Sequence, residues 1–467
     1  MRRRLAGLIG SRFLRESTTL QGASFATAAS NLLGSVILTH VLGATQLGVF
    51  YTAMSAFSLL WALLNLGLPA VVTAEVARAL QSGRTADVTR WLGALAWLTP
   101  ATALVAALLG WFALAPLCVL AYRALGTEIG PLAAWMCLLP LIDAPRIVLS
   151  TALQSTRRMA SLARIDLGQE LVRVVLVSVG ALVTGNAYGP LVGTLLASVG
   201  GSVLALDLYR QARRDGAPLP PLRDVLRARE APLGRALQEG VKVGFVRNVD
   251  ALGVQILPSL ILPIFAHVAW VSYLRIAQRI VAMARLVMQG INRTALPALS
   301  ALAGVKDVQG LRRMYWRASL LSGATISLGI IVALPFLPFL IRGLFPEDFH
   351  GPVWRIVLIL VPGVMVVSFS VANDVFYLVT RQMRVAIWLS LLGLIVNTAQ
   401  ITLFAWWLPT IGVAIGLSVT CLWSLVHVAY AWRWFRTHAG PLDRAPRDSG
   451  TSQAAAGPAA PPAERGA

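Results

Sequence analysis

Charged residues are scarce in this sequence. Asp, Glu, Lys and Arg make up 13% of the 467 residues, whereas 57% are hydrophobic and the mean hydropathy is +0.71. A soluble domain carries about 25% charged residues. Between Glu16 and Glu75 there is no Asp, Glu, Lys or Arg at all, which leaves room for two membrane spans of about 20–25 residues. The composition excludes a soluble protein and predicts a polytopic membrane protein.

Cysteine is rare, and the motifs of several enzyme classes are missing. Cys118, Cys137 and Cys421 lie in apolar segments without metal-ligand spacing, so they predict no disulfide framework and no metal site. No stretch resembles a phosphate-binding loop, a zinc-ligand pattern or a nucleophile elbow. The predicted external loops are too short to hold a folded catalytic site. We therefore predict no enzyme, no catalytic residue, no metal and no cofactor, and transport is the remaining function.

The apolar segments predict an all-α integral membrane fold with about twelve transmembrane helices. An even number of spans places both termini on the same side of the membrane. Hydropathy and turn signals give these spans: 18–41, 47–73, 91–115, 131–153, 163–184, 188–209, 238–263, 270–301, 314–341, 353–379, 384–407 and 411–434.

The basic residues give the orientation. The net charge is +20, but the charges are dispersed between apolar segments, which argues against a nucleic-acid partner. Most of the 40 Lys and Arg residues fall in the termini and in alternate loops, as the positive-inside rule requires. We therefore predict a multi-pass protein of the bacterial cytoplasmic (inner) membrane, with both termini cytoplasmic and membrane lipids as its surroundings.

The spans divide into two halves. We predict a basic N-terminus at 1–17, a six-helix lobe at 18–210, a cytoplasmic linker at 211–237, a second six-helix lobe at 238–435 and a disordered tail at 436–467. A parallel internal repeat with an offset near 222 relates the lobes. Leu139-Pro140 corresponds to Val361-Pro362, and the small-residue turn after the first span corresponds to Phe265–Trp270.

The stretch Trp270–Leu302 is apolar enough to cross the membrane, yet its polar residues gather on one face. At about 100° per residue, they fall within roughly 140° of arc. An arginine at mid-bilayer costs at least a few kcal/mol unless it meets water or an anion. The stripe predicts a wet, cationic cavity, although some members could instead pair with carboxylates or sit at the interface. The residues are Arg275, Gln278, Arg279, Arg285, Gln289, Asn292 and Arg293.

Other spans also carry charges. Asp143/Arg146 and Arg247/Asp250 are i,i+3 pairs, which are equally consistent with internal ion pairs that only neutralise buried charge and with a functional role. In the functional interpretation the arginines bind an anionic headgroup, and an aspartate titrates for ion coupling. The predicted headgroup ligands are Arg275, Arg279, Arg285, Arg247, Arg146 and Arg173. The predicted coupling residues are Asp143, Asp250 and Asp374, and the predicted cavity-lining polar residues are Asn31, Asn65, Gln255, Gln289 and Asn373.

Three short segments resemble a known family. Val41–Phe50 matches an "LGxxxxGxF/Y" turn between the first two spans, and Leu64–Ala70 carries the "LGL" that follows it. Asn397 and Leu408–Gly416 resemble the "N…IPxxGxxGA" entry to the last span, with Val413-Ala414 in place of Gly-Ala. These features are similar to those of polysaccharide-exporting flippases of the multidrug/oligosaccharidyl-lipid/polysaccharide superfamily.

The resemblance implies a two-lobed transporter that works by alternating access. Its substrate would be an undecaprenyl-diphosphate-linked oligosaccharide moved from the inner to the outer leaflet, and its partners would include a polysaccharide polymerase and glycosyltransferases. The cationic stripe agrees, because Arg binds diphosphate bidentately.

Four alternatives remain at this stage. A multidrug extrusion-type cation antiporter should have an acidic cavity, but the first span here has no acid. A lipid-linked peptidoglycan precursor flippase typically has fourteen spans, and the sequence has no room for two more. From other classes, the chain could be a membrane enzyme of polysaccharide assembly or an accessory scaffold of a synthesis complex.

Overall fold

The computed structural model describes residues 2–65, 67–156, 158–228, 231–283, 307–380 and 382–438. Within these ranges every element is a helix, the helices are joined by short turns, and there is no strand, which confirms the predicted all-α fold. Eight helical stretches of the described chain are long and apolar enough to cross a membrane, and two of them, Phe25–Leu64 and Thr85–Ser155, are long enough for two spans each.

The described helices and their short connections cover eleven of the twelve predicted spans and the first part of the eighth. Residues 269–283 are also helical and begin the eighth span. In the N-terminal half the elements are α1 (Arg2–Leu64), α2 (Leu68–Gln81), α3 (Thr85–Leu109), η1 (Gly110–Leu114), α4 (Ala115–Tyr122), η2 (Arg123–Leu125), α5 (Gly126–Met136), α6 (Leu139–Ser155), α7 (Met159–Thr184), α8 (Tyr188–Arg214) and α9 (Leu222–Leu226). In the C-terminal half they are α10 (Leu233–Ala251), η3 (Leu252–Ile256), α11 (Leu257–Phe265), α13 (Val308–Ala333), α14 (Leu337–Leu344), α15 (Glu347–Ser368), α16 (Asn373–Val379), α17 (Met383–Trp407), α18 (Gly412–Thr420) and α19 (Trp423–His438).

Glycines set the two breaks in the first two spans. Gly43 has φ 65° and ψ 178°, and it kinks α1 at the predicted turn between the spans. The second predicted span, 47–73, is not one continuous helix. It stops at Leu64 and resumes at Leu68, because Gly67 adopts a left-handed conformation at φ 61° and Pro69 suits the first turn of a new helix.

The helix starts reveal the predicted parallel repeat. α13, α15, α17 and α18 begin 223, 221, 224 and 224 residues after α3, α5, α7 and α8 respectively. The kink at Gly43 likewise corresponds to the end of α11 at Phe265. Insertions and deletions in the loops would change the offset from one pair of helices to the next if the two halves were unrelated. A near-constant offset over four elements therefore indicates two copies of one six-span unit.

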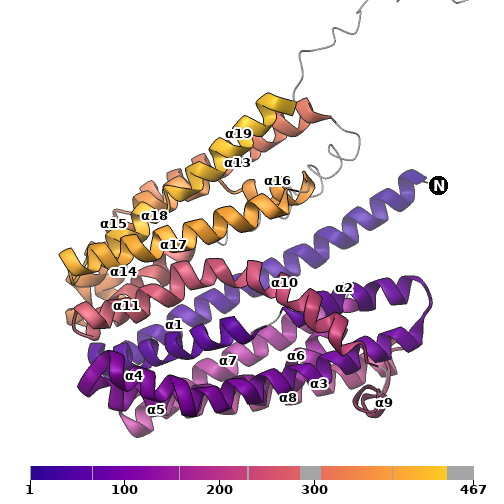
Figure 1. The fold of residues 1–467 in the computed structure, drawn as a ribbon, viewed down its shortest axis with the longest axis horizontal. Helices are drawn as coiled ribbons and strands as arrows, with labels where there is room; N and C mark the ends of the chain where they lie inside the picture. The colour runs from indigo at the N-terminus through magenta and orange to yellow at the C-terminus, as the bar shows by residue number, and fades with distance from the viewer. Residues whose placement is uncertain are drawn as a thin grey trace, which may run out of the picture.

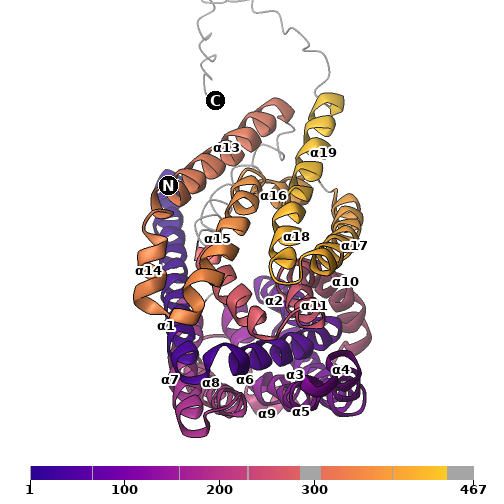
Figure 2. The ribbon, with the colours of Figure 1, turned by 90° about the vertical axis from the view of Figure 1, so that its left-hand side faces the viewer.

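The two halves form separate lobes that share a core at one end. Figure 1 shows the N-terminal lobe below and most of the C-terminal lobe above, with α10 and α11 along the boundary. Figure 2 shows the same division from the end. One buried cluster combines side chains of both lobes, such as Leu47 and Val271. At this end Gly48 packs so closely on the backbone of Val268 that a Cβ would lie 2.2 Å from its carbonyl oxygen.

Two further clusters belong largely to one lobe each. The first joins α2, α3, α6 and α8 around Leu92 and Tyr209, and the second joins α13, α16 and α19 around Tyr315. α10 also packs on the N-terminal lobe, where Asn248 Nδ2 donates to the Ala62 carbonyl oxygen at 2.7 Å. The lobes are therefore independent units that meet through a shared core and through α10.

Small residues bring α7 and α8 into backbone contact. A Cβ on Gly189 would lie 2.1 Å from the carbonyl oxygen of Gly180, and a Cβ on Gly193 would lie 2.4 Å from the carbonyl oxygen of Leu176. Within a membrane such close approach of small residues drives helix association, because there is no hydrophobic effect between helices in lipid.

We expect Gly189→Ala to destabilise the N-terminal lobe, because the added methyl must push α8 away from α7. An overpacked contact of this kind costs about 1–3 kcal/mol. The melting temperature of the purified protein in detergent, followed by circular dichroism, measures the effect. The matched control is Gly329→Ala in α13, where an added Cβ meets nothing within 4 Å. Equal melting temperatures for the two variants would contradict the close-packing account.

Candidate functional site

A small closed cavity lies between α1, α7 and the helix at 269–283. Its volume is about 20 Å³, enough for roughly one water molecule. Two of the predicted arginines point to it from opposite lobes. The lining residues are Asn31, Gly34, Leu38, Phe50, Tyr51, Met54, Arg173, Val174, Val177 and Arg279.

Asn31 joins the two arginines. Arg279 Nη1 donates to the Asn31 backbone carbonyl at 3.0 Å, and Arg173 Nη2 donates to Asn31 Oδ1 at 2.6 Å. The Arg279 guanidinium also lies over the ring of Tyr51, 5.3 Å from its centroid, which is within range of a cation–π interaction. Side chains that are 142 and 248 residues apart from Asn31 in sequence thus meet at one residue of the first span.

Arg275 adds a third guanidinium one turn before Arg279. Its Nη2 donates to Ser55 Oγ at 2.6 Å, while its buried Nε has no hydrogen-bond partner, and neither has the buried hydroxyl of Tyr51. Among the residues that the structure describes, no carboxylate lies within ion-pair distance of Arg275 or Arg279. Within the described residues, these two charges are therefore compensated by dipoles and an aromatic ring.

The arginines lie at a similar depth. Arg279 is ten residues beyond the start of the described helix at 269, and Arg173 is eleven residues before the end of α7 at Thr184. At a rise of 1.5 Å per residue, each arginine lies about 15–17 Å from the helix end named for it. This distance is about half the thickness of the hydrocarbon core. At this depth an uncompensated positive charge is expensive and attracts anions.

Arg146 and Asp143 lie outside this cavity. The Arg146 guanidinium forms a bidentate pair with Asp143 on the same helix, with Nε 2.7 Å from Oδ1. Its Nη1 is also 4.0 Å from Asp166 on α7. This geometry matches the ion-pair interpretation of the two residues, since both carboxylates compensate the guanidinium.

We expect Arg146→Gln to lower stability more than the double substitution with Asp143→Asn. The single change leaves a largely buried carboxylate without its main partner, whereas the double change removes both charges. Because both side chains are partly exposed, the difference should be modest, about 1–3 kcal/mol. A double-mutant cycle of melting temperatures measures it, and strictly additive effects would contradict the pairing.

The remaining predicted residues lie elsewhere. Asn373 is buried among the α13–α16 side chains, where its Oδ1 accepts from the Tyr315 hydroxyl at 2.6 Å. Gln255 lies in η3 and is exposed. Asn65 is contacted through its backbone, since its carbonyl oxygen accepts from Asn248 Nδ2 at 3.1 Å. Arg285 and Gln289, with Asn292 and Arg293, lie outside the described residues, as do the side chains of Arg247, Asp250 and Asp374.

The prediction from sequence missed three members of the site. Tyr51 and Ser55 lie in a long uncharged run and carried no signal of their own. Glu170 was visible only as a residue three positions before Arg173, a spacing that suits an ion pair on one helix. In the structure Glu170 Oε2 accepts from Arg173 Nε at 3.0 Å.

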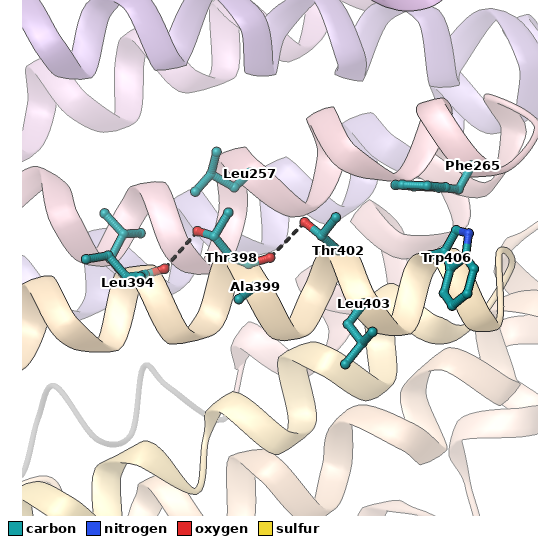
Figure 3. Close-up of a pocket in the computed structure, with 9 residues that line it drawn as sticks. Leu257, Phe265, Leu394, Thr398, Ala399, Thr402, Leu403 and Trp406 are labelled. Atoms are coloured by element: carbon teal, nitrogen blue, oxygen red, sulfur yellow. Dashed lines mark hydrogen bonds between the residues drawn. The ribbon is translucent and has the colours of Figure 1, made fainter.

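The larger groove of the described structure is not suited to a charged headgroup. It has a volume of about 810 Å³ and lies between α11 and α17. Figure 3 shows that its lining is apolar apart from two threonines. The hydroxyls of Thr398 and Thr402 donate to the backbone carbonyls of Leu394 and Thr398, at 2.7 and 2.8 Å, and so present mainly methyl groups. This groove is therefore an apolar surface.

The described residues form a two-lobed helical fold with partly buried arginines between its lobes, an arrangement that suits a membrane transporter. Comparison with known families makes the class specific. Residues 13–303 match the family described as polysaccharide biosynthesis protein, and the chain belongs to this family. The resemblance seen in the sequence is thereby confirmed. Comparison with curated protein sequences found no match.

Solved structures share the fold at low sequence identity. An inward-facing multidrug resistance MATE family transporter of the MOP superfamily has a TM-score of 0.70 and 16% identity, with 88% of this chain and 95% of that chain covered. The lipid II flippase MurJ in an inward closed conformation has a TM-score of 0.66 and 13% identity, covering 89% and 87%. A MOP superfamily transporter from Pyrococcus furiosus, whose title reports a binding pocket of reverse polarity, has a TM-score of 0.60, 16% identity and coverage of 92% and 96%. These likenesses establish the fold of MOP superfamily transporters.

Proposed function

We propose that this protein flips an anionic polyprenyl-diphosphate-linked oligosaccharide from the inner to the outer leaflet for cell-surface polysaccharide biosynthesis. The observation that carries the proposal is the group of arginines between the lobes, of which Arg275 and Arg279 have no carboxylate partner in the described structure. The family match supports the biosynthetic context.

The chemistry of the site favours a diphosphate. A guanidinium offers a planar fork of donors that matches phosphate oxygens bidentately, and low-dielectric surroundings strengthen each contact. The closed cavity, at about 20 Å³, is far too small for a headgroup. Binding therefore requires the lobes to separate around Asn31, which alternating access between two lobes would provide.

The cation-antiporter alternative fits less well. A cationic drug would meet the guanidinium groups of Arg173 and Arg279, and Glu170 is already paired with Arg173. Like charges brought together at low dielectric repel strongly. An anion, in contrast, would bring a full negative charge to Arg275 and Arg279, which now contact only the Ser55 hydroxyl and the Asn31 carbonyl by hydrogen bonds in the described structure.

The cellular setting follows from the same proposal. The protein would act in the bacterial inner membrane with both termini cytoplasmic, and its ion coupling would use a membrane carboxylate. Glycosyltransferases would supply the lipid-linked substrate on the cytoplasmic leaflet, and a polysaccharide polymerase would use it on the outer leaflet.

Deletion of the gene separates transport from the other classes. We expect lipid-linked oligosaccharide to accumulate on the cytoplasmic leaflet of the deletion strain while its synthesis continues. Wild-type protein supplied in trans should clear the accumulated material, and the Arg275/Arg279 double alanine variant should not. If synthesis of the intermediate stopped altogether, the membrane-enzyme alternative would replace the transport proposal.

A further inference from the structure

Glu170 is a largely buried acid that contacts Arg173, a residue of the cavity. It lies one helical turn before Arg173 on α7, and the two side chains form a bidentate pair, with Oε2 3.0 Å from Nε and Oε1 2.5 Å from Nη2. The Glu170 side chain is only 11% exposed. In the described part of the chain, no other acid pairs with an arginine of this cavity.

We propose that Glu170 is the internal counter-ion of the substrate site, which holds Arg173 while the cavity is empty and releases it to the anionic headgroup. This inference rests on the proposed function. It assigns Glu170 a regulatory role in binding and release, and it makes Arg173 a ligand that is available only part of the time.

The geometry of the guanidinium explains the competition. One edge of Arg173, formed by Nε and Nη2, is the edge that binds a carboxylate or a phosphate bidentately, and Glu170 occupies it. Nη2 also donates to Asn31 Oδ1, which fixes the fork toward the cavity. An anionic headgroup can engage this edge only by displacing Glu170, so part of the binding free energy is spent on breaking the ion pair.

Competition of this kind suits a transporter. Without Glu170, both arginines of the cavity, Arg173 and Arg279, would have no carboxylate partner in the described structure, which is costly at mid-membrane depth. With Glu170, the closed empty state is partly neutralised, and the carboxylate can reclaim Arg173 when the headgroup leaves. The pair therefore lowers affinity and favours release.

Few other titratable groups face this part of α7. α8 has none between Tyr188 and Asp207, and α1 has only His40 and Tyr51 between Glu16 and its end. The remaining groups are Arg275 and Arg279 from the helix at 269–283, and Asp166 one turn earlier on α7 with Arg146 and Asp143 of α6.

Binding of farnesyl diphosphate to the purified full-length protein, measured by isothermal titration calorimetry at pH 7, tests the proposal. We expect Glu170→Gln to bind about tenfold more tightly than wild type, within the usual range of coupling between two ligands. The matched control is Asp166→Asn, an acid on the same helix outside the cavity, which should bind as wild type does.

The outcomes are distinct. If wild type binds the probe but Glu170→Gln binds equally or more weakly with an unchanged melting temperature, Glu170 only positions Arg173 and the inference is overturned. If neither protein binds the probe, the proposed anionic substrate is overturned and this inference with it. If Glu170→Gln does not fold, Glu170→Asp replaces it, because the shorter side chain holds Arg173 less well; binding no tighter than that of wild type would then overturn the inference.

Discussion

Arg279→Ala should reduce export of the lipid-linked oligosaccharide by about 10–100-fold while the protein remains in the membrane. The lost contact is a charge-assisted interaction with the headgroup, worth about 1.5–3 kcal/mol, and each 1.4 kcal/mol is a factor of ten. Arg279 also has no carboxylate partner in the described structure, so its removal leaves no described acid unpaired. Surface polysaccharide per cell, normalised to the amount of membrane-inserted protein, measures the effect.

Arg342→Ala is the matched control for Arg279→Ala. Arg342 lies in the last turn of α14 and is exposed, so the same loss of a guanidinium should leave export within twofold of wild type. Arg279→Lys should fall between wild type and alanine, because lysine keeps the charge but cannot bind bidentately. Wild-type export from a stably expressed Arg279→Ala protein would show that this arginine has only a packing role.

Asn31→Asp should abolish export almost completely, although it changes only one amide group to a carboxylate. The new carboxylate would lie where Asn31 Oδ1 now accepts from Arg173 at 2.6 Å, next to Arg279. It would neutralise the positive potential that recruits an anion, and it should stabilise the empty protein through new ion pairs. We therefore expect normal or higher melting temperatures together with the loss of export.

Asn31→Ala distinguishes the effect of an added negative charge from the effect of losing the amide group. Alanine removes the contact to Arg173 Nη2 but adds no negative charge, so export should fall less than in Asn31→Asp. The comparison uses the same export assay. A more severe defect in Asn31→Ala than in Asn31→Asp would mean that the amide positions the helices and that cavity charge is not the controlling variable.

Much of the fold follows from local sequence signals. The uncharged run between Glu16 and Glu75 contains two spans, and Gly43 turns the chain between them, because a residue at positive φ favours glycine. The repeat offset was visible from a few Pro and Gly landmarks. The break at Gly67 was missed, since the apolar run continues through it and hydropathy does not register backbone conformation.

The site was predicted less completely, because a helical stripe identifies a face but not its partners. Arg275 and Arg279 were identified from their spacing. Their contacts with Ser55, Tyr51 and Asn31 depend on how α1 packs against the eighth span, which no single-sequence pattern encodes. For the same reason Arg146 and Arg173 looked alike in sequence, although the first pairs with Asp143 outside the cavity and the second lines it.

The central claim is that this protein moves an anionic, lipid-linked headgroup across the membrane. Proteoliposomes that contain the purified protein and a fluorescent polyprenyl-diphosphate-linked oligosaccharide test it most directly, with the accessible fraction read out by a membrane-impermeant quencher. We predict that wild-type protein makes nearly all of the headgroup accessible over time, whereas Arg279→Ala vesicles remain near the half that protein-free vesicles show. Equal accessibility with wild-type protein and without protein would contradict the account.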